Sequence, residues 1–192
     1  MKLFFLRHTS LDVGFDIFYG QTDVDVSDTF EEEVKNIKKK LELNNVDLEK
    51  LRVISSPLKR CKKLTERITG NHETDDRIKE MNLGDWEMKK MSSIPKEDKI
   101  NWENNILSFK IPNGESNKEF LNRLKNFLDD IIKIGQDVFL VCHAGSINGM
   151  ISILTGEPFD KLVKNYWEKI SYGSLSLIEV KKGKVFKKRI GI

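Results

Sequence analysis

The chain is poor in cysteine and has no long hydrophobic run, and these absences exclude several classes of protein. Cys61 and Cys142 are the only cysteines among 192 residues, and they stand in no paired spacing. They suggest neither a disulfide framework nor a thiolate zinc site. No apolar run approaches the roughly 18 residues of a membrane span, and residues 1–6 meet Arg7 before a signal-peptide core develops. We therefore expect a soluble, cytoplasmic protein without a membrane partner.

Charge of one sign is also scarce. The chain has 33 basic and 30 acidic residues, a net charge of +3, which argues neither for nor against a polyanionic partner. Hydrophobic residues make up 39% and charged residues 33%, both within the globular range. We expect one compact domain over residues 1–192.

Short apolar runs predict buried strands separated by helices. Residues 2–6 and 137–142 are too short for helices, and 52–55 is a weaker third run. Such continuous runs favour parallel strands that are covered on both faces, which predicts a three-layer α/β/α sandwich with a mostly parallel central sheet. Capping boxes, proline and glycine predict helices over 28–43, 57–69, 116–135 and 144–154, and a closing hairpin over 174–180 and 184–190.

Residues 85–113 are less regular than the rest of the chain. They contain Trp86, Trp102, Phe109 and two prolines among many charges. We expect an irregular insertion that lies over the active site.

Two of the three histidines follow predicted strands. Arg7 and His8 come directly after the first strand, and His143 comes directly after a later one. Because parallel strands end at the same edge of the sheet, these side chains share one edge. Ligands of α/β proteins bind beyond the carboxyl ends of the strands, at that edge. A single histidine there is equally well explained as a structural residue, but two at equivalent strand ends favour a functional site. His72, in a polar stretch, is expected at the surface.

Arg60 and Glu80 add an anion-binding group and a carboxyl group. The turn at 55–57 leads from a strand end into the helix that carries Arg60, where a guanidinium can bind an anion with two hydrogen bonds. Taken alone, Arg60 fits a solvated helix face and Glu80 fits a surface carboxylate. Two imidazoles, two guanidinium groups and a carboxylic acid together supply what metal-free phosphoryl transfer needs, namely attack, charge neutralisation and leaving-group protonation.

Five motifs are spread over nearly the whole chain. They are Leu6-Arg7-His8-Thr9, Ser55-Ser56-Pro57-Leu58-Lys59-Arg60, the stretch 80–87, Gly114-Glu115-Ser116 and Cys142-His143-Ala144-Gly145. In this order they resemble the histidine phosphatase superfamily, also called phosphoglycerate mutase-like. The resemblance implies a phosphatase without metal or organic cofactor, in which His8 becomes a phosphohistidine and Glu80 donates the proton. Arg7, Arg60 and His143 would hold the transferred oxygens.

Thr9 departs from the family pattern, in which a glycine often follows the Arg-His pair. Glycine there would permit close backbone approach to the phosphate. Thr9 permits the same approach if its backbone angles are ordinary, and its hydroxyl adds a donor. We interpret Thr9 as the mark of a subgroup and expect it to bind substrate.

A narrower resemblance concerns the substrate. The stretches 7–13, 19–24, 30–33 and 84–88 are similar to those of the alpha-ribazole phosphatase branch, which acts in cobalamin nucleotide-loop synthesis. This implies hydrolysis of alpha-ribazole 5′-phosphate, a small-molecule phosphate ester, with inorganic phosphate as product. The residues that would bind substrate are Thr9, Tyr19, Gly20, Gln21 and Ala144. A tight turn before a helix explains residues 19–21 equally well.

Other functions stay open on the sequence alone. A broad-specificity sugar or small-metabolite phosphatase would share every catalytic residue. A phosphoglycerate mutase would return the phosphoryl group to its substrate, but such mutases are usually longer. A metal hydrolase on His8 and His143 lacks a short ligand spacing, and lost activity has no positive support. The lysines of 181–189 could bind a nucleic acid or acidic partner, although lysines also commonly protect an exposed sheet edge, so we expect no nucleic-acid partner.

Overall fold

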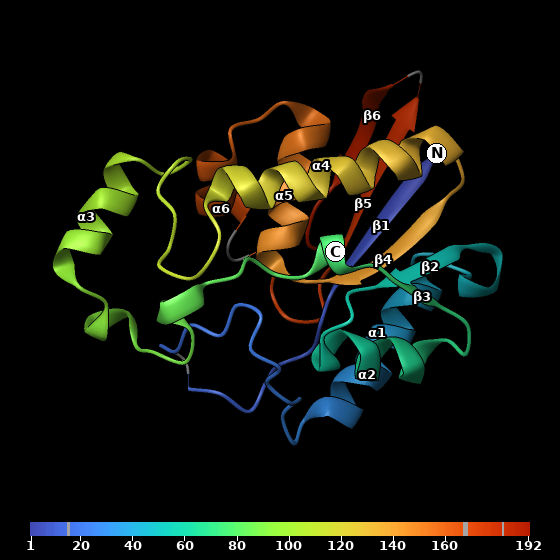
Figure 1. Cartoon of the computed structure of the whole chain (residues 1–192). Coiled ribbons are helices and arrows are strands. Elements are labelled where there is room, and N and C mark those ends of the chain that lie inside the picture. The colour runs from blue at the N-terminus through green and yellow to red at the C-terminus, as the bar shows by residue number, and fades with distance from the viewer. Residues whose placement is uncertain (15, 167–168, 182) are drawn as a thin grey trace.

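A six-stranded sheet with helices on both faces forms the centre of the computed structural model, which describes residues 1–14, 16–166, 169–181 and 183–192 (Figure 1). The strands are β1 (Lys2–Arg7), β2 (Arg52–Ser55), β3 (Glu73–Thr74), β4 (Val138–Cys142), β5 (Leu175–Lys181) and β6 (Lys184–Arg189). Their order across the sheet is β3-β2-β4-β1-β5-β6. The first four pair in parallel, and β5 and β6 add an antiparallel hairpin beside β1.

The helices complete the three layers that the sequence predicts. They are α1 (Phe30–Leu43), α2 (Lys59–Ile68), α3 (Lys96–Asn104), α4 (Asn117–Ile134), α5 (Ala144–Thr155) and α6 (Phe159–Tyr166), with 3-10 turns at Leu48–Lys50, Asp76–Ile78, Gly84–Trp86 and Met91–Ser93. Side chains of α1 and α2 pack on one face of the sheet. Those of α4, α5 and α6 pack on the other face, whereas α3 stands away from the sheet in Figure 1. The three-layer α/β prediction is confirmed.

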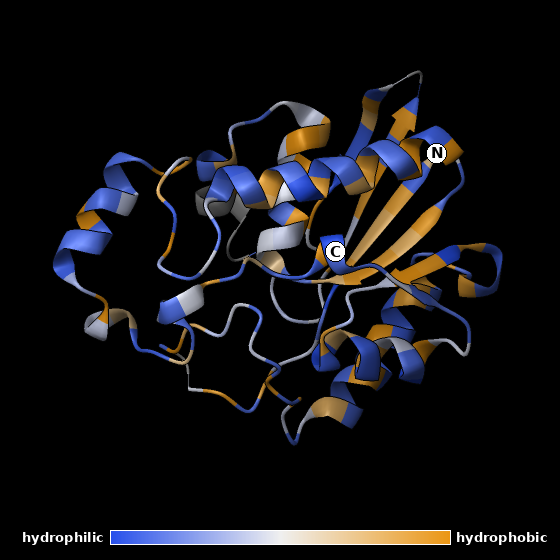
Figure 2. Cartoon of the chain, in the orientation of Figure 1, coloured by the Kyte–Doolittle hydropathy of each residue, from blue (hydrophilic) through white to orange (hydrophobic). Residues whose placement is uncertain are grey.

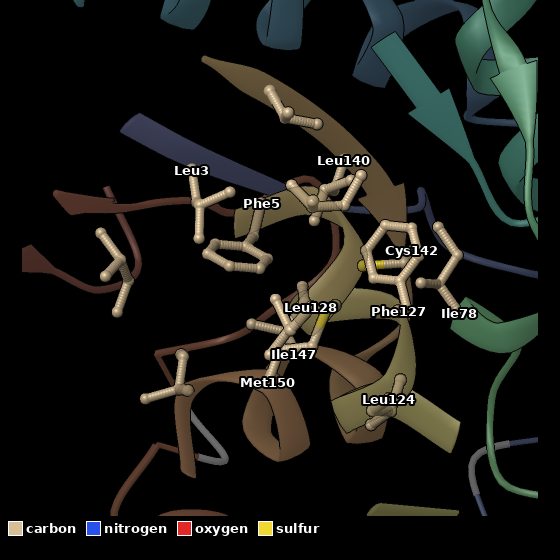
Figure 3. Close-up of a cluster of buried hydrophobic side chains, with 14 of the residues drawn as sticks. Leu3, Phe5, Ile78, Leu124, Phe127, Leu128, Leu140, Cys142, Ile147 and Met150 are labelled. Atoms are coloured by element: carbon tan, nitrogen blue, oxygen red, sulfur yellow. The ribbon is translucent and has the colours of Figure 1, made fainter. Parts of the chain in front are cut away.

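The central strands are buried on both faces because successive side chains alternate between two hydrophobic clusters. On β1, Leu3 and Phe5 join the cluster under α4 and α5, while Phe4 and Leu6 join the cluster over α1 and α2. Figure 3 shows the first cluster, and Figure 2 shows β1 as a continuous hydrophobic run. Burying one leucine or phenylalanine side chain fully contributes about 1.5–3 kcal/mol to the stability of the folded state. The core therefore holds the carboxyl ends of β1 and β4 rigidly.

Helix ends agree with the sequence where the capping groups are strong. The side chain of Ser116 accepts from the Glu119 N–H and Glu119 accepts in return, which forms the predicted capping box, and Gly135 ends α4 with φ of 75°. Two other predicted ends were wrong. The second helix begins at Lys59 rather than Pro57. The predicted capping box of Asp28 and Glu31 is absent, because the first helix begins at Phe30 with Thr29 as its N-cap and without a side-chain cap bond.

Two short elements carried no sequence signal that we used. The strand β3 has only two residues, both exposed, and pairs with the edge of β2. The helix α6 begins shortly after Gly156 and a proline. Its apolar pattern is too short to be distinguished from that of a loop. Within the described residues, no helix has the length and apolar character that crossing a membrane requires.

The segment 85–113 forms a small hydrophobic cluster of its own. Trp86 and Ile94 are buried in it, and Trp102 of α3 packs against it. The ring of Trp86 stacks on Phe109 at 5.9 Å between centroids. An isolated bridge between Ile17 and Lys90 joins this segment to the loop after β1. Its irregular backbone is therefore tied to the loops rather than to the sheet.

Candidate active site

His8 and His143 meet where β1 and β4 end. The two strands are parallel neighbours, with Arg7 opposite Cys142, and the His8 N–H donates to the Cys142 carbonyl at 3.1 Å. Their imidazole rings lie 5.2 Å apart, and both side chains are buried. The sheet register thus brings together two histidines that are far apart in the sequence, as predicted.

Hydrogen bonds assign the tautomers of the two rings. The His8 Nδ1 lies 2.7 Å from the Thr9 carbonyl oxygen, which can only accept, so Nδ1 carries the proton and Nε2 keeps a free electron pair. The Arg60 Nε can only donate, so the His143 Nδ1 that it meets at 3.1 Å is an acceptor. The proton of His143 then lies on Nε2, which donates to Ser56 Oγ at 2.8 Å.

Both imidazoles are held in the neutral form. Burial lowers the pKa of His8 well below its usual range, the charges of Arg60 and Arg7 lower it further, and the Thr9 carbonyl opposes them. Burial also lowers the pKa of His143, with Arg60 as the next cause. A neutral His8 with a free Nε2 has the form that a nucleophile needs.

Arg60 is fully buried in the first turn of α2, so the alternative of a solvated helix face is wrong for it. Each of its three nitrogens is already engaged. Nε donates to His143, one terminal nitrogen donates to the Thr22 carbonyl at 2.9 Å, and the other donates to the Gly20 carbonyl at 2.6 Å. Arg60 therefore orients His143 and holds the loop 19–22 against the strand ends.

Arg7 is less restrained than Arg60. One terminal nitrogen donates to the Ile170 carbonyl at 2.8 Å, and the buried Nε finds no hydrogen-bond partner among the described residues. Nor does either arginine form a salt bridge with a carboxylate in the part of the chain that the structure describes. Arg60 is fully buried and Arg7 is half-buried, and positive charge without an opposite charge to pair with is costly in such places. These strand ends therefore favour an anion.

Thr9 and Ala144 follow the two histidines. The Thr9 side chain is fully buried, and its Oγ1 has no hydrogen-bond partner within the described ranges. Its φ is not positive, so its backbone is ordinary, as the sequence argument required. Ala144 is half-buried as the first residue of α5, and its carbonyl accepts from Asn148. Thr9 therefore offers a free hydroxyl, while Ala144 offers only backbone.

Glu80 lies beside the turn that follows His143. One carboxylate oxygen accepts from the Gly145 N–H at 3.0 Å and the other from the Met81 N–H at 3.0 Å. A side chain on Gly145 would collide with this carboxylate, which explains a glycine there. The Glu80 carbonyl also accepts from Arg123 at 2.7 Å. The half-buried carboxyl group is thus fixed against the first turn of α5, two residues after His143.

The loop 19–21 belongs to the same site. Gln21 donates from its side chain to the Glu80 carbonyl at 3.0 Å, and its N–H donates to Glu87 at 2.8 Å. Gly20 has φ of 30°, and a side chain there would collide with the Glu87 carboxylate and the Met81 carbonyl. The Tyr19 ring lies 5.3 Å from the Arg60 guanidinium. The loop is therefore more than a tight turn before a helix.

Four residues that the sequence analysis gave no role also shape the site. Ser56 and Glu87 lie within two of the five motifs, and this position is a signal that could have indicated them. Arg123 lies on α4, where a charged face gives no signal. Tyr172 precedes β5, outside every motif, yet its ring centroid lies 4.0 Å from the Arg7 guanidinium carbon and 5.6 Å from the His8 ring.

Two of the alternative functions, a metal hydrolase and a basic-patch binding protein, can be compared with the structure. Within the described residues, no three His, Cys, Asp or Glu side chains gather in a way that could hold a metal ion. On β6, Lys187 pairs with Glu179 and Lys188 pairs with Glu157, which reduces the charge of the basic edge. Four of the five motif regions, 6–9, 55–60, 80–87 and 142–145, meet at the strand ends instead.

Comparisons with known proteins agree with this geometry. The family model of the histidine phosphatase superfamily (branch 1) matches residues 3–192. An adenosylcobalamin/alpha-ribazole phosphatase of Escherichia coli (strain K12) is 25% identical over 191 residues, 94% of this chain and 90% of that protein. Phosphoserine phosphatase 1 of Hydrogenobacter thermophilus is 26% identical over 191 residues, which cover 93% of this chain and 88% of that protein. The crystal structure of the alpha-ribazole phosphatase from Shigella flexneri matches with a TM-score of 0.82 and 23% identity, over 99% of this chain and 95% of that one, which confirms the fold.

Proposed function

Because the chain belongs to the histidine phosphatase superfamily (branch 1), we propose that it hydrolyses phosphate monoesters of small molecules through a phosphohistidine at His8. The observation that carries the proposal is a neutral histidine with a free Nε2 beside two arginines. No carboxylate neutralises either arginine in a salt bridge within the described residues. An imidazole nucleophile in a cationic pocket suits phosphoryl transfer.

In the first half of the reaction, His8 Nε2 attacks phosphorus and the bond from phosphorus to the ester oxygen breaks. Arg7 and the Thr9 hydroxyl hold the phosphoryl oxygens, and Arg60 adds positive charge while it keeps His143 in place. Protonated Glu80 gives its proton to the leaving oxygen. The alcohol leaves, and His8 carries the phosphoryl group.

In the second half, water attacks the phosphohistidine. Glu80, now a carboxylate, takes a proton from this water, and the phosphorus–nitrogen bond breaks. The electron pair of the broken bond returns to His8 Nε2, so His8 is neutral again, and inorganic phosphate leaves with the water oxygen bonded to phosphorus. Glu80 thus serves both half-reactions in opposite protonation states, while His8 first takes up and then releases the phosphoryl group.

For the substrate we propose alpha-ribazole 5′-phosphate. The similarity to the Escherichia coli protein and the 19–24 and 84–88 stretches support it. The phosphoserine phosphatase relative supports O-phosphoserine as the second candidate. A broad-specificity sugar or small-metabolite phosphatase and a phosphoglycerate mutase remain alternatives with the same catalytic residues. A role in cobalamin biosynthesis and a cytoplasmic location stay predictions.

The test is phosphate release in the presence of EDTA by the wild type and by His8→Ala. The substrates are alpha-ribazole 5′-phosphate, O-phosphoserine, 3-phosphoglycerate and p-nitrophenyl phosphate. The expected result is His8-dependent release that is rapid with the first substrate and slower with the other three. Release from O-phosphoserine alone would replace the substrate but keep the mechanism, and slow release from all four would indicate broad specificity. No release from any of them would contradict the phosphatase proposal.

A further inference from the structure

Tyr172 lies beside the side chains of Arg7 and His8, on a turn that none of the five motifs includes. The turn is bound to both residues of the Arg-His pair. The Gly173 N–H donates to the His8 carbonyl at 3.1 Å, and the Arg7 side chain donates to the Ile170 carbonyl at 2.8 Å. The Tyr172 side chain is 39% exposed, so its position serves the site more than the core.

The ring of Tyr172 contacts the one arginine that hydrogen bonds leave free to turn. All three side-chain nitrogens of Arg60 donate to carbonyls or to an imidazole, and these bonds fix the plane of its guanidinium group. Arg7 has one such bond, and its Nε has no partner among the described residues. The Tyr172 ring centroid, 4.0 Å from the Arg7 guanidinium carbon, supplies the missing restraint, because a cation over an aromatic face is attracted to it.

A second contact joins Tyr172 to Tyr19, on the loop 19–22. Its hydroxyl lies 3.0 Å from the hydroxyl of Tyr19, whose ring lies 5.3 Å from the Arg60 guanidinium. Burial raises the pKa of Tyr19, with the neighbouring Tyr172 as the next cause, so the Tyr19 hydroxyl keeps its proton. The tyrosine pair thus links the neighbourhoods of the two arginines.

We propose that Tyr172 is a positioning residue for phosphoryl binding, which acts by holding the Arg7 guanidinium in the plane that meets the phosphoryl oxygens. This inference rests on the proposed function. Because the phosphoryl group is common to all substrates, losing the ring weakens every ester alike, and it weakens inorganic phosphate too. The hydroxyl contact with Tyr19 has the smaller part, because it touches no phosphoryl ligand directly.

The test compares Tyr172→Leu and Tyr172→Phe, with Phe186→Leu as the matched control. Phe186 is an exposed aromatic residue on β6, the edge strand that β5 separates from β1. Two measurements are made on each variant, kcat/KM for p-nitrophenyl phosphate and the Kd of inorganic phosphate by calorimetry. We expect about a tenfold loss in both for Tyr172→Leu, a loss of about two- to threefold for Tyr172→Phe, and wild-type values for Phe186→Leu.

A double-mutant cycle separates positioning from general damage. If Tyr172 acts through Arg7, then Tyr172→Leu adds less than about twofold in an Arg7→Gln background. An undiminished tenfold loss in that background would overturn the inference, as would equal values for Tyr172→Leu and the wild type. If the wild type released no phosphate from any ester but its phosphate Kd still depended on Tyr172, the inference would stand while the proposed function failed.

Discussion

His8 and His143 stand on neighbouring strands whose register fixes their distance, whereas Gln21 and Leu83 stand on loops that one carboxylate, Glu87, joins. The first region, the phosphoryl side, comprises Arg7, His8, Arg60 and His143. The second region, the loop side, comprises residues 17–22 and 80–91. The sheet and its two hydrophobic clusters make the phosphoryl side rigid, while hydrogen bonds between loops leave the loop side open to change. The common part of any substrate should therefore meet the first region and the variable part the second.

The largest effect is expected from Arg60→Ala, on the phosphoryl side. It removes a buried cation and leaves two carbonyls and the His143 Nδ1 without their donor. We expect about 3 kcal/mol lower unfolding free energy and a loss of roughly 10²-fold or more in kcat/KM for every ester. Urea unfolding and kinetics on two unlike esters measure this. Lys62→Ala, an exposed neighbour on α2, is the control, and a loss for one ester only would break the distinction between the two regions.

Glu80→Gln tests the boundary between the regions. The amide keeps the shape of the side chain but cannot give up a proton to the leaving oxygen. We expect a loss of about 10²–10³-fold for alkyl phosphates and a much smaller loss for p-nitrophenyl phosphate, whose leaving group needs little protonation. Steady-state kinetics with a series of leaving groups gives the slope. Equal losses across the series would show that Glu80 is not the proton donor.

The pH dependence of stability separates the regions in another way. Burial lowers the pKa of both His8 and His143, so below about pH 6.5 the unfolded chain takes up protons that the folded chain does not. Stability is thus full above this pH and falls as the pH decreases, by up to about 1.4 kcal/mol per pH unit for each histidine.

Urea unfolding between pH 5 and 7 gives this slope, in a window above that of the carboxylates whose pKa is lowered. His8→Gln should have a visibly shallower slope than the wild type. An unchanged slope in His8→Gln would mean that His8 is charged in the folded protein.

Glu87→Gln tests the loop side alone. The carboxylate accepts from the N–H groups of Gln21, Thr22 and Leu83, and an amide offers only one oxygen for them. We expect about a tenfold higher KM for the preferred substrate and less than about a twofold change in the Kd of inorganic phosphate. Glu103→Gln on α3 serves as control. A parallel loss of phosphate binding would show that the loops also shape the phosphoryl side.

The smallest effect is expected from Trp102→Ala. Trp102 packs at the margin of the cluster in 85–113, whereas Trp86 is buried within it. Trp102→Ala should change the ratio of kcat/KM between alpha-ribazole 5′-phosphate and p-nitrophenyl phosphate by a few fold, and Trp86→Ala should instead lower the melting temperature. An equal loss on both esters in Trp102→Ala would indicate structural damage rather than a role in substrate preference.

The same contrast explains what the sequence could predict. Apolar runs define β1 and β4, and the residue after each run is fixed in space by the sheet, so His8 and His143 could be paired without a structure. Ser116 and Gly135 bound α4 for equally local reasons. The three layers follow from the same runs.

The loop side could not be assembled in this way. Its two loops are joined by contacts between residues far apart in the sequence, such as Gln21 with Glu80 and with Glu87, which are 59 and 66 positions away, and no periodicity encodes them. Tyr172 precedes a predicted strand but contacts Arg7 only because β5 pairs antiparallel with β1. Local patterns carry no information on such pairings, so these roles needed the structure.

The central claim is that His8 carries the phosphoryl group, and trapping the phosphoenzyme tests it most directly. The wild type is mixed rapidly with an ester, quenched in alkali and digested, and the peptides are analysed by mass spectrometry. We predict one phosphoryl group on His8 Nε2 that is stable in alkali, is lost in acid and is absent from His8→Ala. Turnover by the wild type with no phosphohistidine, or wild-type turnover by His8→Ala, would contradict the account.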